Sequence, residues 1–207
     1  MKGYLHKNKE AYDKSVEFTK KHLKKYRKDY ETTTKRIFKY LGKKENILEL
    51  GPAHGYVTKL LSKKGHSVTA LEFSKLRAKE AKKVSPKAKI INAEFLSHDF
   101  KNKKYPLVVA FAFIHLFPPR ELSKVMKKIR SLLNKDGLLF INTTTHKKPK
   151  EGFLKRGDGH IRYRRQFTKK ELSNLLLKKG FVVLETFRSK GAPGGIELIN
   201  FICKKQS

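Results

Sequence analysis

The 207-residue chain is long enough for one domain with a sizeable core, and its 38% hydrophobic and 33% charged residues suit a soluble globular protein. It has no apolar run of about 18 residues and no apolar secretion signal at its N-terminus, so we predict no membrane span and a cytoplasmic location. Cys203 is the one cysteine, which excludes a disulfide framework and a cysteine-based zinc site, and we predict no bound metal.

The formal net charge of +32 raises the question of a nucleic-acid partner. Only 10 of the 50 basic residues are arginine, although arginine is the residue that recognises phosphates and bases with paired hydrogen bonds. The lysines are spread along the whole chain, often as adjacent pairs, and form no dense arm. A general lysine bias therefore explains the charge as well as nucleic-acid binding does, and both interpretations stay open.

The first two thirds of the chain alternate helical and strand-like patterns. Apolar residues in 8–41 are spaced as in two helices, which end before Gly42. Strands are predicted at 46–50, 67–73, 89–93, 106–113 and 138–144, and helices at 56–62, after Ser74, and between Pro118 and Gly137. This alternation predicts an α/β fold, in which five parallel strands form a doubly wound sheet with helices on both faces.

The last third follows a different pattern. Residues 145–167 are polar and rich in basic side chains, and we predict a loop over the sheet edge. Thr168 and Glu171 form a capping box for a helix that ends before the strand at 181–187. A second strand at 196–202 follows a Gly-Pro-rich turn with no intervening helix, so the two strands must pair as an antiparallel hairpin.

A ligand-binding turn is expected after the first strand, in the segment ILELGPAHG. Open α/β sheets bind ligands at the carboxyl ends of their strands, and Gly51 and Gly55 allow a tight turn and a close approach of the backbone. The dinucleotide fingerprint G-x-G-x-x-G fails here, because Ala53 and Tyr56 stand where its second and third glycines belong. Glu49, just before the glycines, suits a ligand that carries a positive ammonium group.

These residues resemble motif I of the class I S-adenosylmethionine (SAM)-dependent methyltransferases, (D/E)-x-G-x-G-x-G, with Ala53 in place of the middle glycine. The resemblance covers about residues 45–204 and implies a Rossmann-like fold. It also implies that Glu72 binds both ribose hydroxyls, and that Glu94 recognises the adenine amino group while Phe95 packs on the ring. The full set of expected cofactor-binding residues is Glu49, Gly51, Pro52, Ala53, His54, Gly55, Glu72, Phe73, Glu94, Phe95 and Phe111.

The resemblance also indicates which segments face the methyl acceptor. The N-terminal AYDKSVEFTKKHLKKY is similar to a helical lid of small-molecule members, so residues 1–42 are assigned as a lid, with Tyr4 and Tyr12 facing the site or serving as packing residues. His115, beyond the fourth strand, is the candidate general base, or else a packed histidine at a helix entry. His160, Arg162 and Arg164 lie in the segment 145–167, where they clamp an anionic substrate or form a solvated basic loop.

We therefore predict a single domain, with a cofactor-binding core at 43–144 and the C-terminal helix and hairpin at 168–207. The predicted function is SAM-dependent methyl transfer to an O or N nucleophile of a small molecule, anionic if the basic segment is a clamp. AFAF stands at the end of the fourth strand, where methyltransferases of nucleic-acid base amines commonly carry N-P-P-Y or D-P-P-Y. The alternatives are an RNA methyltransferase that uses the basic surface, and a non-catalytic cofactor-binding module. The sequence does not indicate the oligomeric state.

Overall fold

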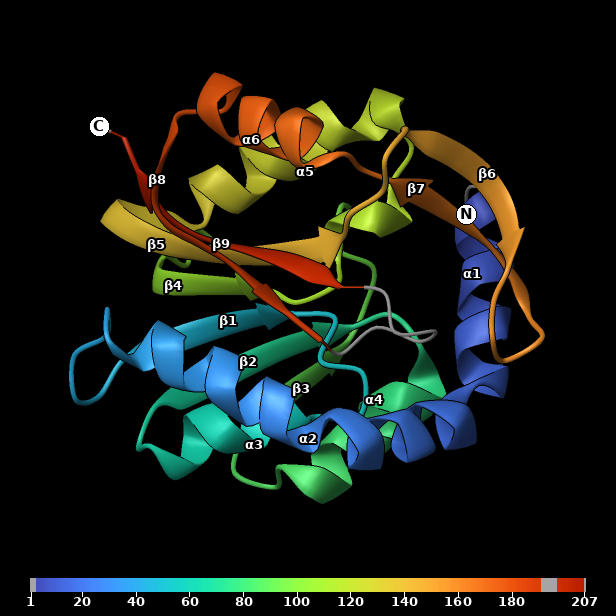
Figure 1. The fold of residues 1–207 in the computed structure, drawn as a ribbon. Coiled ribbons are helices and arrows are strands. Elements are labelled where there is room, and N and C mark those ends of the chain that lie inside the picture. The colour runs from blue at the N-terminus through green and yellow to red at the C-terminus, as the bar shows by residue number, and fades with distance from the viewer. Residues whose placement is uncertain (1–2, 191–196, 207) are drawn as a thin grey trace.

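The computed structural model describes residues 3–190 and 197–206, and they form a mixed sheet between two layers of helices (Figure 1). The seven strands lie in the order β3-β2-β1-β4-β5-β9-β8, and a separate two-stranded sheet pairs β6 with β7. The strands are β1 (Asn46–Leu50), β2 (Ser67–Glu72), β3 (Lys89–Asn92), β4 (Tyr105–Ala110), β5 (Leu133–Thr144), β6 (Lys150–Lys155), β7 (Ile161–Gln166), β8 (Phe181–Ser189) and β9 (Leu198–Lys205). The helices are α1 (Gly3–Lys14), α2 (Val16–Phe38), α3 (Tyr56–Lys63), α4 (Lys75–Val84), α5 (Pro119–Ser131) and α6 (Lys169–Lys178), with a short 3-10 helix η1 (Ile114–Leu116).

The predicted α/β architecture is confirmed. Strands β1 to β5 pair in parallel, while β9 pairs antiparallel with both β5 and β8. The chain therefore adds the last strand between β5 and β8 instead of at the sheet edge. The Gly-Pro-rich turn predicted between β8 and β9 falls on residues 191–196, which lie outside the described residues.

Apolar residues on both faces of the central strands pack against the helices. One face packs with α5 and α6, through side chains such as Met126 and Leu176, and the other packs with α2 and α3, through Ile37 and Leu61. Figure 1 shows these two helix layers above and below the sheet. Continuous apolar strands are expected when both faces of a parallel sheet are covered. No helix in the described ranges is long and apolar enough to cross a membrane.

Local signals in the sequence explain where the helices begin. Ser74 accepts a hydrogen bond from the backbone N–H of Arg77, and the Thr168–Glu171 capping box is formed from both sides. Such N-caps stabilise a helix by about 1 kcal/mol. Pro119 occupies the first position of α5, where its missing N–H has no cost.

The N-terminal helices wrap from one helix layer to the end of the sheet. α2 lies along the face that it shares with α3, and α1 stands beyond the carboxyl ends of the parallel strands, beside β6 and β7 (Figure 1). Asn8 fastens α1 to β7, because its side-chain amide donates to the carbonyl of Tyr163 at 3.2 Å and accepts from the N–H of Tyr163 at 2.7 Å. This amide replaces a neighbouring strand at the edge of the small sheet.

Three predicted boundaries were wrong. Residues 145–167 are not a loop, since β6 and β7 form a hairpin whose alternating pattern was hidden by its many polar side chains. The fourth strand ends at Ala110 instead of 113, because Ala112 turns the chain with φ 48° and donates its N–H to Asn142. Gly137 does not end a helix; α5 ends at Ser131, and Gly137 lies within β5 at an irregularity in its pairing with β4.

Candidate active site

A cavity of about 200 Å³ opens at the carboxyl ends of β1, β2 and β4. It lies where β1 and β4 are neighbours, with β2 and β3 on the far side of β1 and β5 on the far side of β4. Such a switch point is where open α/β sheets bind ligands. The floor comes from the strand ends, while α1, the first half of α2 and the hairpin β6–β7 contribute residues between Leu5 and Tyr30 and between Arg156 and Arg164. The cavity is therefore covered from both ends of the chain.

The turn after β1 takes a left-handed backbone at three positions: Gly51 (φ 71°), Ala53 (φ 52°) and Gly55 (φ 79°). Glycine is required at position 55, because a Cβ atom there would lie 2.8 Å from the Cα of Ala81 on α4. Gly55 thus lets the start of α3 approach α4, although Gly55 itself does not line the cavity. Ala53, which does line it, adopts a conformation that is unfavourable for any residue with a Cβ.

Glu49 is a buried carboxyl group in the wall of the cavity. The hydroxyl of Thr58 donates a hydrogen bond to it at 2.6 Å. Burial raises the pKa of Glu49 to about 7, although the Thr58 hydrogen bond opposes this shift and the charge of Glu72 adds to it. No basic side chain among the described residues forms an ion pair with Glu49, so this carboxylate would be stabilised by a cationic ligand.

Glu72 is also buried, at the end of β2. Its two oxygens accept backbone N–H groups, one from Ala53 at 3.1 Å and one from Ser74 at 3.0 Å. Burial raises its pKa, while the charge of Arg77 and the backbone hydrogen bonds act in the opposite direction. A carboxylate has about four acceptor positions, so Glu72 is held in place and can still accept two further donors.

Glu94 follows β3, and its oxygens accept the N–H groups of Leu96 at 2.9 Å and Ser97 at 2.8 Å. The neighbouring Phe95 is buried and packs edge-on against Phe113. An acceptor beside an apolar ring surface suits a flat heteroaromatic group with an exocyclic amine. The expected cofactor-binding residues that line the cavity are Glu49, Gly51, Pro52, Ala53, His54, Glu72, Phe73, Glu94, Phe95 and Phe111.

His54 lies in the turn after β1 and contacts α2. Its Nε2 atom lies 3.0 Å from the carbonyl oxygen of Thr19, while its Nδ1 atom is buried without a hydrogen-bond partner in the described structure. Burial lowers the pKa of His54 to about 4, so the ring is neutral at pH 7. A buried nitrogen without a partner is uncommon in proteins, so Nδ1 of His54 is a polar atom that the described structure leaves unsatisfied.

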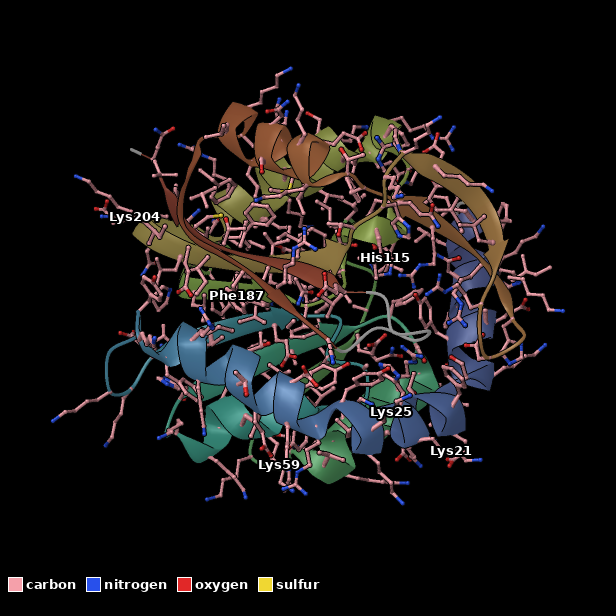
Figure 2. The ribbon with its side chains drawn as sticks, in the orientation of Figure 1. Lys21, Lys25, Lys59, His115, Phe187 and Lys204 are labelled. Atoms are coloured by element: carbon pink, nitrogen blue, oxygen red, sulfur yellow. The ribbon has the colours of Figure 1, made fainter. Side chains whose placement is uncertain are left out.

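His115, the candidate general base, is buried in η1 and lines the cavity (Figure 2). Its Nδ1 atom lies 3.5 Å from the hydroxyl of Thr143, and its Nε2 atom is buried without a partner in the described structure. Burial lowers its pKa well below 6.5, and the charges of nearby arginines, Arg164 foremost, lower it further. The imidazole is therefore neutral at pH 7.

Of the two tyrosines expected to face the site, Tyr12 lines the cavity and Tyr4 does not. Tyr12 lines the cavity, with its ring edge-on to Phe73. Tyr4 does not line the cavity, and a substrate-binding role for it is not supported. Its ring packs against Tyr163, and its hydroxyl donates to the buried carboxylate of Glu121.

The basic segment contributes two of its three expected residues. Arg162 and Arg164 line the cavity, whereas His160 lies outside it in the turn of the hairpin, where its N–H bonds to Asp158. Side chains alternate along a strand, so residues 162 and 164 share one face of β7. Both arginines line the cavity, which indicates that this face is turned toward it.

Sequence reasoning missed two further arginines in the cavity wall, Arg77 and Arg156. Arg77 is buried, donates to the carbonyl of Tyr12 at 3.2 Å and to the hydroxyl of Ser15 at 2.9 Å, and so ties α4 to the α1–α2 junction. No pattern in the sequence distinguishes it from the many basic residues on helix surfaces. Arg156 follows β6 and would have been found had 145–167 been predicted as a hairpin.

A family model described as a methyltransferase domain matches residues 22–186, which is most of the chain. The chain therefore belongs to this methyltransferase domain family. A curated relative, an uncharacterized methyltransferase of Alkaliphilus oremlandii (strain OhILAs), is 31% identical over 136 residues, or 65% of this chain. The match spans 62% of that relative's length, less than two thirds.

Two solved structures share the fold. One is the 1,6-didemethyltoxoflavin-N1-methyltransferase of Burkholderia thailandensis, with its substrate and S-adenosylhomocysteine bound (TM-score 0.71, 19% identity, 86% of this chain and 79% of that one). The other is a SAM-dependent methyltransferase of Methanosarcina mazei (TM-score 0.74, 20% identity, 82% and 96%). At these identities the likeness concerns the fold.

Proposed function

We propose that this chain is a SAM-dependent methyltransferase that transfers a methyl group to an O or N nucleophile of a small, anionic molecule. The observation that carries the proposal is the composition of one covered cavity. Carboxylates at the ends of three successive strands line it, together with arginines from the hairpin. A cationic nucleoside and an anionic acceptor would each meet the opposite charge.

The residues of the cavity fit the cofactor that the family implies. Glu49, buried without a basic partner in the described structure, suits an ammonium group. Glu72 suits two adjacent hydroxyls, because backbone hydrogen bonds hold its carboxylate in place and leave two acceptor positions open. Glu94 and Phe95 suit an amino-substituted ring. When bound, SAM supplies an electrophilic methyl group on a sulfonium sulfur.

The protein's own contribution is orientation and the exclusion of water. α1 and the hairpin form part of the cavity wall, so an acceptor bound between them and the strand ends would lose part of its contact with water. His115 is neutral at pH 7 and, with its proton on Nδ1, its unpaired Nε2 can accept a hydrogen bond from the O–H or N–H of a nucleophile. This would orient a lone pair of the nucleophile toward the methyl group and take up a proton as the bond forms.

The cover also bears on the alternative of an RNA methyltransferase. An RNA substrate needs an open basic groove beside the cofactor, whereas here residues of α1, α2 and the hairpin form part of the cavity wall. Figure 2 shows Lys21, Lys25, Lys59 and Lys204 projecting outward from α2, α3 and the opposite end of the sheet. This scatter supports a compositional origin of the charge. Steeply salt-dependent RNA binding, with a slope of several phosphate contacts, would favour the alternative instead.

Calorimetry with SAM tests cofactor binding, and a screen with methyl-labelled SAM against separate metabolite and RNA pools tests the acceptor. We expect binding by the unaltered protein, at least tenfold weaker binding by Glu72→Ala, and label in the metabolite pool. Equal binding by the two proteins would refute the assignment of Glu72. Binding without label in either pool would favour a non-catalytic module, and label in RNA alone would refute the small-molecule acceptor.

A further inference from the structure

Four arginines surround one part of the cavity: Arg77 on α4, and Arg156, Arg162 and Arg164 on the hairpin. Two of them have partners that explain their position. Arg162 is buried in an ion pair with Asp158, which is also buried, and Arg77 donates to a carbonyl and a hydroxyl near the charge of Glu72.

Arg156 and Arg164 lack such compensation. Among the described residues, no carboxylate lies within ion-pair distance of either guanidinium, and Asp158, the acidic group whose charge acts on Arg156, is already paired with Arg162. Arg164 has a hydrogen bond with the side chain of Tyr12, which is a hydroxyl and not a carboxylate. Both arginines are partly buried and both face the cavity.

The physical consequence is a concentration of unbalanced positive charge inside a covered space. Burial, together with the charges of Arg156 and Arg162, lowers the pKa of Arg164 to about 10. Placing like charges together in a partly desolvated site is unfavourable unless a ligand of the opposite charge completes it. Guanidinium groups bind carboxylate and phosphate oxygens through paired, charge-assisted hydrogen bonds, which lysine cannot reproduce.

The arginines also act on the candidate base. The charges of Arg164, Arg156 and Arg162 all lower the pKa of His115, so this group of charges lies close to the end of β4. An anion held between Arg156 and Arg164 would therefore lie near His115, which lines the same cavity.

We propose that the acceptor carries a doubly charged oxyanion, a phosphoryl group or a pair of carboxylates, and that Arg156 and Arg164 bind it. This inference rests on the proposed function and narrows its substrate class. Arg162 and Arg77 instead hold the cover in place through Asp158 and through the α1–α2 junction. The two uncompensated charges favour a dianion over a monoanion or a neutral acceptor.

The test is a titration of the protein, with and without saturating S-adenosylhomocysteine, with methylphosphonate, succinate and acetate at constant ionic strength. Arg156→Gln and Arg164→Gln are the test variants. Lys155→Gln is the matched control, because Lys155 is an exposed cation next to Arg156 on the same hairpin. S-adenosylhomocysteine affinity is measured separately for every protein.

We expect one of the dianions to bind at least tenfold more tightly than acetate, and each arginine variant to lose at least tenfold in that affinity while Lys155→Gln loses none. Tighter methylphosphonate or tighter succinate binding identifies the phosphoryl or the dicarboxylate class. Because neither arginine has an ion pair among the described residues, we also expect both variants to unfold at the same or a higher temperature than the unaltered protein.

Dianion binding that is equal in all four proteins, or absent while S-adenosylhomocysteine binds, would overturn the inference and leave the proposed function standing. If the unaltered protein does not bind S-adenosylhomocysteine, the proposed function is overturned. The titration without S-adenosylhomocysteine would then still show whether Arg156 and Arg164 bind a dianion. Unfolding of the arginine variants at a clearly lower temperature would assign both residues to the fold instead of to a ligand.

Discussion

Replacing the buried carboxyl group of Glu49 by an amide should stabilise the protein without ligand at neutral and alkaline pH. Glutamine keeps the shape and can still accept the hydrogen bond from Thr58, but it cannot ionise. In the unaltered protein, ionisation of Glu49 occurs in a space that burial has removed from water and that has no basic partner in the described structure. The variant avoids this unfavourable ionisation.

The size and sign of the effect follow from the pKa of Glu49, which rises from 4.5 to about 7 on folding. An acid whose pKa is higher in the folded state contributes stability that is complete below pH 4.5 and is lost as the pH rises through 7. At about 1.4 kcal/mol for each pKa unit, the full loss is on the order of 3 kcal/mol, most of it between pH 5 and 8. Glu49→Gln does not undergo this loss.

Urea unfolding of both proteins at pH 5, 6, 7 and 8, without ligand, measures the effect. The difference in unfolding free energy between Glu49→Gln and the unaltered protein should grow with pH in favour of the variant, by about 2–3 kcal/mol in total. Glu17→Gln, which removes an exposed carboxylate, is the control and should show no comparable trend. A difference that stays constant from pH 5 to 8 would refute the argument. Under the proposed function, the same variant binds SAM more weakly at pH 8.

Three further substitutions test the backbone of the site and its cover. Gly55→Ala should destabilise the protein by at least about 1–2 kcal/mol, because a left-handed alanine is strained and its Cβ would lie 2.8 Å from the Cα of Ala81. Thermal unfolding measures this effect, and an unchanged midpoint temperature would contradict it. Ala53→Gly should do the reverse, raising the unfolding free energy by up to about 1 kcal/mol, because glycine tolerates the φ of 52°; a loss in the same unfolding assay would show that the alanine side chain packs favourably. Asn8→Ala removes the hydrogen-bond partner of both backbone groups of Tyr163 and should lower the free energy of unfolding by about 2–3 kcal/mol. Amide hydrogen exchange should become faster along α1 and stay unchanged in β1. Exchange in α1 that is as slow as in the unaltered protein would contradict the role given to Asn8.

The elements of the sheet could be predicted because their signals are local. Short apolar runs bounded by turn residues define β1 to β5, and the Thr168–Glu171 capping box fixes the start of α6. The Gly-Pro-rich sequence between the last two predicted strands favoured a turn over a helix, and hence antiparallel pairing. The position of β9 between β5 and β8 could not be predicted, because it depends on which sheet edge is free after the first five strands have formed.

The parts of the site differ in the same way. The cofactor turn and the strand-end carboxylates could be located from sequence, since each lies at a fixed offset from a strand. Arg77 and Arg156 could not, because they reach the cavity through the packing of α4 and of the hairpin. Tyr4 takes the packing role that the sequence left open, since its hydroxyl donates to Glu121 although its neighbour Leu5 lines the cavity.

The bond between Asn8 and Tyr163 joins positions 155 residues apart, and this has a consequence during synthesis. The residues that follow β1, β2 and β3 emerge from the ribosome early and close together, so a nascent chain can bring the cofactor-facing carboxylates near one another before its last third exists. The acceptor side cannot form at that stage, because α1 has no strand to bind until β7 has been made. A chain arrested before β7 would therefore lack the arginines of the hairpin and the anchor for its first helix at the same time.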